Sequence, residues 1–362
     1  MSTRIQSRHS ASGAHPVALS YTGVERPFRD PLRYAGARSL RIDTCHPKLS
    51  LQTLLDILKV AHNLEELTLN NAISPQVSTE PDVHTITLPR LRTLIMSHPP
   101  SVNQRILSHL SLPAARTVNL ADDISDIEGP ELFDLDEAFA AILPRDAGAV
   151  LPLLHTTTSV VFDVYRQSCD LTAYTVHDGE SLRLSLYDSD DHPYFNALGG
   201  VCAQDLVTIF SSAPITHLEI TAAFGEIPIH VFGSVLRAFP QLESLILTGR
   251  GNVDHLWVLL NPWHRAEPPC PYLKEIKIGE DDDWFFANDD FFVSLVSALS
   301  ARAARGTRLT ELCLYLMHES DNTDEYEVLH ARYVPQIEAL VNSVEYNNVE
   351  CREYDMEEDM CL

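Results

Sequence analysis

The sequence is poor in basic residues. Its 26 lysines and arginines stand against 51 aspartates and glutamates, which gives a formal net charge of -25 at pH 7. A strongly acidic surface repels the phosphates of nucleic acids and the headgroups of anionic membranes. The charge therefore argues against nucleic-acid binding and against a membrane surface as partner, and it favours a basic protein partner.

The sequence also lacks long hydrophobic runs, since no stretch offers the ~20 uninterrupted apolar residues of a membrane-spanning helix. It has seven cysteines, an odd number, and no two of them have CxxC spacing. A disulfide framework or a structural zinc site would show a different pattern. These features predict a reducing compartment, the cytoplasm or the nucleus.

Motifs of common catalytic and cofactor sites are missing as well. The chain has no GxxxxGK[ST] phosphate loop, no GxSxG nucleophile elbow and no HExxH zinc motif. Gly249 and Gly251 imitate the start of a dinucleotide fingerprint, but Asp254 stands where its third glycine belongs, so a tight strand-to-helix turn is the better interpretation. The run Asp281–Asp283 lacks the glycine-containing pattern of a calcium loop. We therefore predict no catalytic residue, no cofactor and no metal ion.

What the sequence does contain is a recurring apolar pattern: one apolar residue, two variable residues, then two apolar residues in alternation. The copies are Leu64–Leu69, Leu91–Met96, Ala115–Leu120, Ile215–Ile220, Leu242–Leu247, Leu273–Ile278 and Leu309–Leu314. The alternation has the period of a half-buried strand. Neighbouring copies 24 or 27 residues apart have the spacing of leucine-rich repeats, and the wider gaps of 31 and 36 residues need insertions.

Helical stripes lie between these strand patterns. Apolar residues fall on one helix face in the segments 51–58, 102–110, 231–239 and 291–299. Prolines such as Pro89 and Pro240 stand between a helix and the next strand, where they end the helix. The order of strand, helix and proline turn predicts an α/β leucine-rich-repeat solenoid. Its curved parallel sheet would line the concave face, and its helices would cover the convex face.

The predicted solenoid fills most of the chain. We expect a disordered or irregular leader over 1–36, the solenoid over 37–348 and an acidic tail over 349–362. The repeat pattern is weaker over about 121–200, which we interpret as irregular repeats, and a domain break in this region is an open alternative.

Acidic residues gather in the predicted connections from strand to helix, which in a solenoid stack along one rim. This acidic rim would comprise Asp122, Asp123, Asp126, Asp188, Asp190, Asp191, Glu280, Asp281, Asp282, Asp283, Asp321 and Asp324. Such a rim would attract a basic protein or peptide. The simpler interpretation is a rim that only keeps the protein in solution.

Strand residues that alternate with the buried ones would face a partner on the concave side. These positions are Thr68, Thr93, Ile95, Glu219, Ser244, Ile246, Glu275, Lys277 and Glu311, together with Cys313. Their mixture of charged and apolar side chains is typical of a binding surface, although every solenoid has such positions. The pattern indicates a non-catalytic module for protein–protein interaction.

The segment 26–42, RPFRDPLRYAGARSLRI, resembles the junction between F-box and leucine-rich repeats in fungal F-box proteins. The matching residues are Arg26, Pro27, Tyr34, Ala35, Arg38, Ser39 and Leu40. Segment 88–120 is similar to that family's repeat, with a strand, a helix and an LP turn. The resemblance implies leucine-rich repeats that recognise the substrate of a ubiquitin ligase.

The chain departs from that family before the junction. There the F-box, a three-helix module that opens with an LPxE motif, binds the Skp adaptor of the ligase. Residues 1–25 are too short and too polar to form it, and they contain no LPxE. We therefore expect a protein of this kind without its F-box, and direct binding of the Skp adaptor is not expected.

Two alternatives stay open at this point. A doubly wound α/β enzyme also alternates strands and helices. A hydrolase of that fold could use Asp122 or Asp188 with His192 in the acidic loops. The other alternative is a degenerate paralogue that has lost its function.

Overall fold

The computed structural model of the chain divides into two compact units. The first unit comprises Met1–Thr158 and Arg166–Ala213, and the second comprises Ser159–Tyr165 and Pro214–Leu362. The structure describes residues 17–23, 30–45, 47–75, 85–124, 137–165, 167–176, 181–188, 198–225, 227–261, 269–279, 284–285, 287–318 and 323–350.

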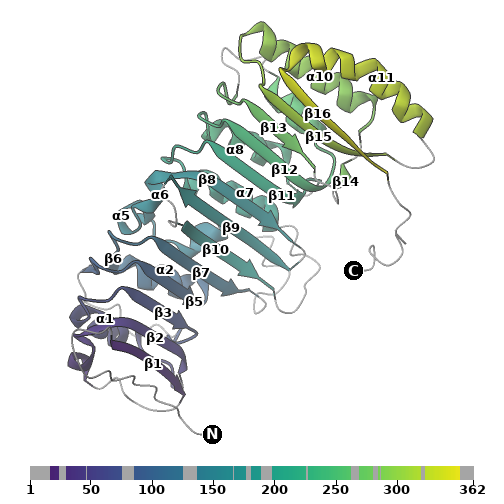
Figure 1. The fold of residues 1–362 in the computed structure, drawn as a ribbon. Coiled ribbons are helices and arrows are strands. Elements are labelled where there is room, and N and C mark those ends of the chain that lie inside the picture. Colours follow the sequence, from purple (N-terminus) through teal and green to yellow (C-terminus); the bar gives the residue numbers. More distant parts are fainter. Residues whose placement is uncertain are drawn as a thin grey trace. The chain divides into compact units, whose positions relative to one another are not determined.

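Strands of the first unit form a sheet in the order β1-β2-β3-β5-β7-β10-β9 (Figure 1). Their bounds are β1 Val17–Gly23, β2 Ala37–Cys45, β3 Glu66–Asn70, β5 Thr93–Ser97, β7 Thr117–Asp123, β10 Ser181–Tyr187 and β9 Ser168–Thr175. All neighbours in this order are parallel except β9 and β10. The short strands β4, Ile86–Thr87, and β6, Leu110–Ser111, pair with each other in a separate sheet.

The helices of the first unit connect successive strands. Their bounds are η2 Pro31–Tyr34, α1 Leu51–Val60, α2 Pro100–Ser108, α4 Phe139–Ile142, α5 Ala147–Val150, α6 Leu153–Thr156 and α7 Leu198–Ile209. The Ser50 side chain caps α1 by accepting a hydrogen bond from the Thr53 N–H at 3.1 Å. Within α1, Leu51, Leu54 and Leu58 are buried, as the helical stripe in the sequence predicts.

The strands of the second unit follow the order β8-β11-β12-β13-β15-β16, and every neighbouring pair among them is parallel. Its elements are β8 Thr157–Val164, β11 His217–Ala223, α8 Ile229–Ala238, β12 Ser244–Gly251, α9 Asp254–Leu260, β13 Glu275–Ile278, β14 Trp284–Phe285, α10 Asp289–Ala304, β15 Glu311–His318, α11 Thr323–Leu340 and β16 Ser343–Glu350. The two-residue strand β14 pairs with the end of β12. Among the described residues, no helix of either unit is long and apolar enough to cross a membrane.

Rows of aligned apolar residues form the core beneath each sheet. In the first unit, the strand register aligns Leu40, Leu67, Leu94, Val118 and Leu182, and each is at most 1% exposed. The second unit repeats the arrangement with Leu218, Leu245, Ile276 and Leu312. All of these except Leu40 and Leu182 are the middle apolar residues of the recurring sequence pattern, so the pattern marks strand residues on the covered face.

Burial alternates along the strands of both units. In β3, β5, β11 and β13 each buried residue is followed by a residue that solvent reaches in part or in full. One face of each sheet is therefore covered, and we call the other the open face. The prediction of an α/β fold with a parallel sheet is confirmed at this level, with one exception: β9 runs antiparallel to β10. A strand in the middle region that reverses direction had no signal in the repeat pattern.

Two further local features differ from the sequence-based expectation. Val17–Gly23, within the expected leader, forms β1 and pairs along its whole length with β2. Gly249 and Gly251, expected in a turn, lie inside β12 with φ of +117° and +110°. A Cβ at position 249 would stand 2.4 Å from the Ala222 carbonyl oxygen. Glycine therefore lets the end of β12 approach the backbone of β11.

A buried histidine fastens a loop of the first unit. Nε2 of His98 accepts hydrogen bonds from the N–H groups of Ala72 and Ile73, at 3.1 and 3.3 Å. Two donors at one nitrogen require a neutral ring whose proton is on Nδ1. Burial, and secondarily the nearby Lys48, lower the pKa of His98 to about 4.

In the second unit a buried arginine has the corresponding role. The Arg302 side chain on α10 is 1% exposed. Its guanidinium donates to the carbonyl oxygens of Pro269, Cys270 and Leu273, each at 3.2 Å. It therefore holds the turn that leads into β13.

Candidate functional site: the open sheet faces

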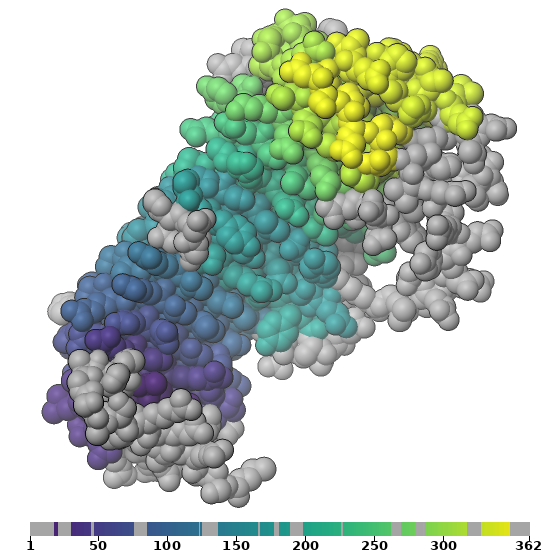
Figure 2. Space-filling model, viewed as in Figure 1, coloured from purple at the N-terminus to yellow at the C-terminus, as the bar shows by residue number. Residues whose placement is uncertain are grey.

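The open face of the second unit carries a row of residues that the strand register aligns. Each of the strands β11, β12, β13, β15 and β16 contributes one residue. In that order they are Glu219, Ile246, Lys277, Cys313 and Glu345. Figure 2 shows atoms of the last elements, α11 and β16, at the surface of this unit. The row mixes apolar, acidic and basic side chains on a rigid backbone.

Three glutamates of this face lie together without a basic partner. Glu275 and Glu311 are direct neighbours in the register of β13 and β15, and Glu345 is on β16. Among the described residues, no lysine, arginine or histidine lies within 4.0 Å of these three carboxylates. Like charges on adjacent strands repel one another, which gives this part of the face a negative potential.

The thiol of Cys313 lies between two of these carboxylates. Its sulfur is 3.6 Å from Oε1 of Glu311 and 3.8 Å from Oε2 of Glu345. Burial and the two negative charges raise the pKa of Cys313 to about 12. The group is therefore a neutral thiol at physiological pH, and it has only one proton to donate.

An aromatic ring borders this cluster. The Tyr315 hydroxyl, on the same strand, is 3.4 Å from Oε1 of Glu345, and Asn347 donates to the same oxygen at 2.9 Å. The Lys277 ammonium lies 5.6 Å from the centroid of the Tyr315 ring, within the range of a cation–π contact. One cation of the face is thus already placed over an aromatic ring.

On the open face of the first unit, two of the acids have basic neighbours. Arg41 pairs with Asp43 at 2.6 Å, and Asn70 donates to the same carboxylate at 2.7 Å. Arg183 pairs with Asp170 at 3.0 Å, and Ser185 donates to that carboxylate at 2.6 Å. Two of the acids on this face are therefore paired with arginines, whereas Glu66, exposed at the start of β3, has no ion pair among the described residues.

Most of the strand residues predicted to face a partner are on the open faces. Eight of them are accessible at least in part: Thr68, Thr93, Ile95, Glu219, Ile246, Glu275, Lys277 and Glu311. Ser244 and Cys313 are the exceptions, since they are only 4% and 7% exposed. The register brings Thr68 next to Ile95 in the first unit and Glu275 next to Glu311 in the second.

The predicted acidic rim needs a correction. Asp122 and Asp188 are each 3% exposed. In their strands they follow the alternation of Leu120 and Leu186, so they lie on the covered side of the sheet and add nothing to an exposed edge. The other ten residues of the predicted rim are outside the described residues or are described in backbone alone. They are Asp123, Asp126, Asp190, Asp191, Glu280, Asp281, Asp282, Asp283, Asp321 and Asp324. His192 of the hydrolase alternative is outside them too.

Sequence reasoning missed Glu345 and Tyr315. An incomplete copy of the repeat at Val341 and Val344 was the only signal of β16, and it did not show the register against β15. In that register Cys313 is opposite Glu345. Glu311 and Glu345, which are 34 residues apart in the sequence, therefore both lie next to the Cys313 thiol. A strand assignment extended by one repeat would have placed Glu345 on the same face as Glu311.

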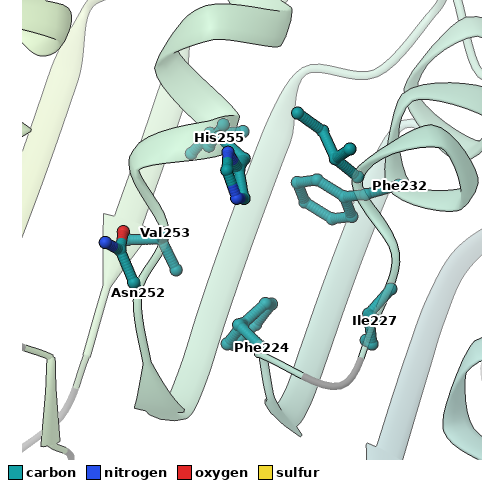
Figure 3. A pocket seen from close by; sticks show the side chains of 8 residues that line it. Phe224, Ile227, Phe232, Asn252, Val253 and His255 are labelled. Atoms are coloured by element: carbon teal, nitrogen blue, oxygen red, sulfur yellow. The ribbon is translucent and has the colours of Figure 1, made fainter.

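The second unit also has a shallow apolar recess of about 300 Å³, a volume that includes space open to solvent. It lies where β11 and β12 lead into α8 and α9, with His255 and Phe232 on opposite sides (Figure 3). It is lined by Phe224, Ile227, Ile229, Phe232, Asn252, Val253, His255 and Leu256. The lining is mainly apolar, with Asn252 and His255 as its polar side chains, so the recess offers space for an apolar side chain.

Within the described part of the chain, no three histidine, cysteine or acidic residues are placed to hold a metal ion. The four cysteines with described side chains, Cys169, Cys202, Cys270 and Cys313, are free. No protein-family model matches the chain, and no curated protein sequence is significantly similar to it.

Proposed function

We propose that this protein is a non-catalytic module that binds another protein on its open sheet faces. The observation that carries the proposal is the alternation of burial along the strands, which leaves one side of each sheet accessible. A doubly wound enzyme would cover both sides with helices and have near-continuous hydrophobic strands. The accessible rows of mixed polar and apolar side chains support recognition instead.

The proposed architecture is a leucine-rich-repeat solenoid. Recurring strand–helix units, aligned leucine rows and parallel neighbours support it, because one such unit cannot bury its apolar face alone and a stack can. By the resemblance of segment 26–42 to fungal F-box proteins, the partner would be a substrate of ubiquitination. The free thiols support a reducing compartment, the cytoplasm or the nucleus.

The experiment compares the full chain and its variants as bait in a lysate of the native cells. Ile95→Arg and Ile246→Arg place a bulky cation on the open face of the first and the second unit. Val258→Arg and Val293→Arg, at residues 58% and 49% exposed on α9 and α10, are the controls. We expect a protein captured by the wild type and by both helix variants to be lost with at least one sheet variant.

Two results would contradict the proposal. One is equal capture by all four variants and the wild type, which would move the interaction away from the sheets. The other is hydrolytic turnover of model esters by the purified wild type that survives both sheet substitutions. Circular dichroism of each variant confirms that the fold is intact before capture is compared.

A further inference from the structure

Two cysteines of the first unit are in contact beneath its sheet. Cys169 is on β9 and Cys202 is on α7, 33 residues further along the chain. Both side chains are 0% exposed, and a hydrogen bond joins their thiols. They are therefore a buried pair of free thiols, which the packing of α7 on β9 brings together.

Strand β9 places its thiol on the covered side of the sheet. Cys169 is opposite Leu186 in the register of β9 and β10, and Leu186 is 1% exposed. Burial alternates along β9, and Leu171, the next residue on the same side, is 0% exposed. The hydrogen bond between the thiols thus lies within the core of the first unit.

The surroundings of Cys202 keep its thiol protonated. Burial, then the hydrogen bond to Cys169 and the charge of Asp205, raise the pKa of Cys202 well above its ordinary value. The thiolate is the form that reacts with oxidants. While α7 is closed on the sheet, Cys202 is therefore protected from oxidation.

We infer that Cys169 and Cys202 are a redox pair, which hydrogen peroxide converts into a disulfide that fixes α7 to β9. One thiolate displaces hydroxide from the peroxide and becomes a sulfenic acid, and the other thiolate displaces hydroxide from that sulfenic sulfur. The two thiols lose two protons and two electrons, and the peroxide becomes two molecules of water. In a reducing compartment a disulfide of this kind is transient and senses oxidants.

The first turn of α7 gives the oxidant access to the pair. Gly199 and Gly200 are in this turn, just before Cys202, and glycine weakens a helix. Local opening there exposes the thiols. Once one sulfur is oxidised, the other thiol is already beside it, and such an intramolecular nucleophile outcompetes thiols in solution. The fold therefore favours the disulfide over further oxidation of a single sulfur.

The test treats the reduced full chain with hydrogen peroxide, removes the peroxide with catalase and alkylates the remaining thiols in urea. Trypsin then yields the fragments 167–183 and 184–237, whose only cysteines are Cys169 and Cys202. Mass spectrometry without a reductant measures how much of the two fragments is cross-linked. Hydrogen exchange of segment 198–209 compares α7 in the oxidised and in the reduced protein.

We expect the two fragments to be the main cross-linked product, and dithiothreitol should restore both thiols. Exchange of α7 should become about tenfold slower in the oxidised protein, because the disulfide restricts the opening of the helix. Cys270 and Cys313 should stay reduced. The first donates to the Leu236 carbonyl oxygen at 3.1 Å, and the second lies beside two carboxylates.

The matched variants are Cys202→Ser and Cys270→Ser, since both cysteines are buried. The first should abolish the cross-link between the two fragments and the second should retain it. The decisive measurement is on the wild type, so a variant that fails to fold does not affect the outcome.

Three results on the wild type would overturn the inference. In the first, both thiols are still alkylated after peroxide or end as separate sulfinic acids. In the second, the cross-link appears only when peroxide acts on the chain unfolded in urea, which would mean that the fold does not direct it. In the third, the cross-linked protein exchanges α7 as fast as the reduced protein.

Discussion

The open faces of the two units differ in how their acidic residues are paired. In the first unit Arg41 and Arg183 lie on the same face as Asp43 and Asp170, and each pair is within 3.0 Å. In the second unit Glu275 and Glu311 are side by side, and neither has such a partner among the described residues. Paired charges on a sheet stabilise it, whereas adjacent like charges destabilise it. The comparison therefore separates a face with ion pairs that add stability from a face whose neighbouring acids cost stability.

In each unit a buried polar side chain is hydrogen-bonded to the backbone of a loop, and the two side chains differ in charge. His98 is neutral and accepts from two backbone N–H groups, whereas Arg302 is charged and donates to three carbonyl oxygens. A change of pH or sequence should therefore affect the two units separately. All three tryptophans, Trp257, Trp263 and Trp284, are in the second unit, so their fluorescence reports on that unit.

The largest effect is expected from Arg302→Leu. Loss of the guanidinium leaves three buried carbonyl oxygens without their donor, which should lower the free energy of unfolding of the second unit by about 4 kcal/mol. Urea unfolding followed by tryptophan fluorescence measures it. Arg237→Leu, at an exposed residue of α8, is the control and should change little. A change below about 1 kcal/mol for Arg302→Leu would mean that water replaces the guanidinium.

The next effect concerns His98 and the first unit. The pKa of about 4 in the folded protein lies below the ordinary value of 6.5, so the unfolded chain takes up the proton first as the pH falls. The stabilisation is complete above pH 6.5 and is lost between pH 6.5 and 4, about 3 kcal/mol in all. Hydrogen exchange of segment 66–75 over this range measures it.

His98→Gln is the control for that prediction. The glutamine carbonyl can accept from the same backbone N–H groups and does not titrate. The pH dependence of exchange in segment 66–75 should then flatten. If the pH dependence of exchange persists in His98→Gln, a titrating group other than His98 stabilises the loop.

A smaller effect should appear at Cys313. Removal of two negative charges by Glu311→Gln with Glu345→Gln lowers the pKa of the thiol from about 12, although burial, the largest cause, remains. We expect alkylation of Cys313 at pH 9 to become about tenfold faster, because each fall of one unit in the pKa raises the thiolate fraction about tenfold. Peptide-resolved mass spectrometry measures the rate. Cys270, whose pKa of about 12 comes from burial, serves as internal reference.

The smallest effects should have opposite signs in the two units. Glu275→Gln removes a repulsion and should stabilise the second unit by about 0.5 kcal/mol at low salt. Asp170→Asn removes the partner of Arg183 and should destabilise the first unit by about 1 kcal/mol. Thermal unfolding at low and high salt tests both, since screening should reduce both differences. Equal signs would remove the contrast between the two faces.

Sequence periodicity was enough to locate the strands of the seven repeat copies and the covered side of those strands. The residues that end each copy of the pattern, such as Leu69, Met96, Leu247 and Leu314, are all buried in strands. The helical stripes at 51–58 and 291–299 lie in α1 and α10. Local periodicity is a property of neighbouring residues, so the sequence carries it without knowledge of the fold.

The predicted acidic rim was wrong at two residues. Composition suggested that carboxylates after strands would be exposed, yet Asp122 and Asp188 continue the alternation of the buried leucines and are 3% exposed. Charge alone does not tell on which side of a sheet a side chain lies. Counting the alternation two residues further along each strand would have placed both on the covered side.

The sequence by itself determined the strands of the seven repeat copies, which of their residues face the helices, and that charge of one sign dominates. Only the tertiary structure decided that β9 reverses direction, that His98 and Arg302 fasten distant loops, and that Glu311 and Glu345 meet at Cys313. The physical reason is the separation along the sequence of the residues that interact. Alternation and helical stripes arise between residues a few positions apart, whereas strand register joins side chains about thirty positions apart, and no local pattern encodes that pairing.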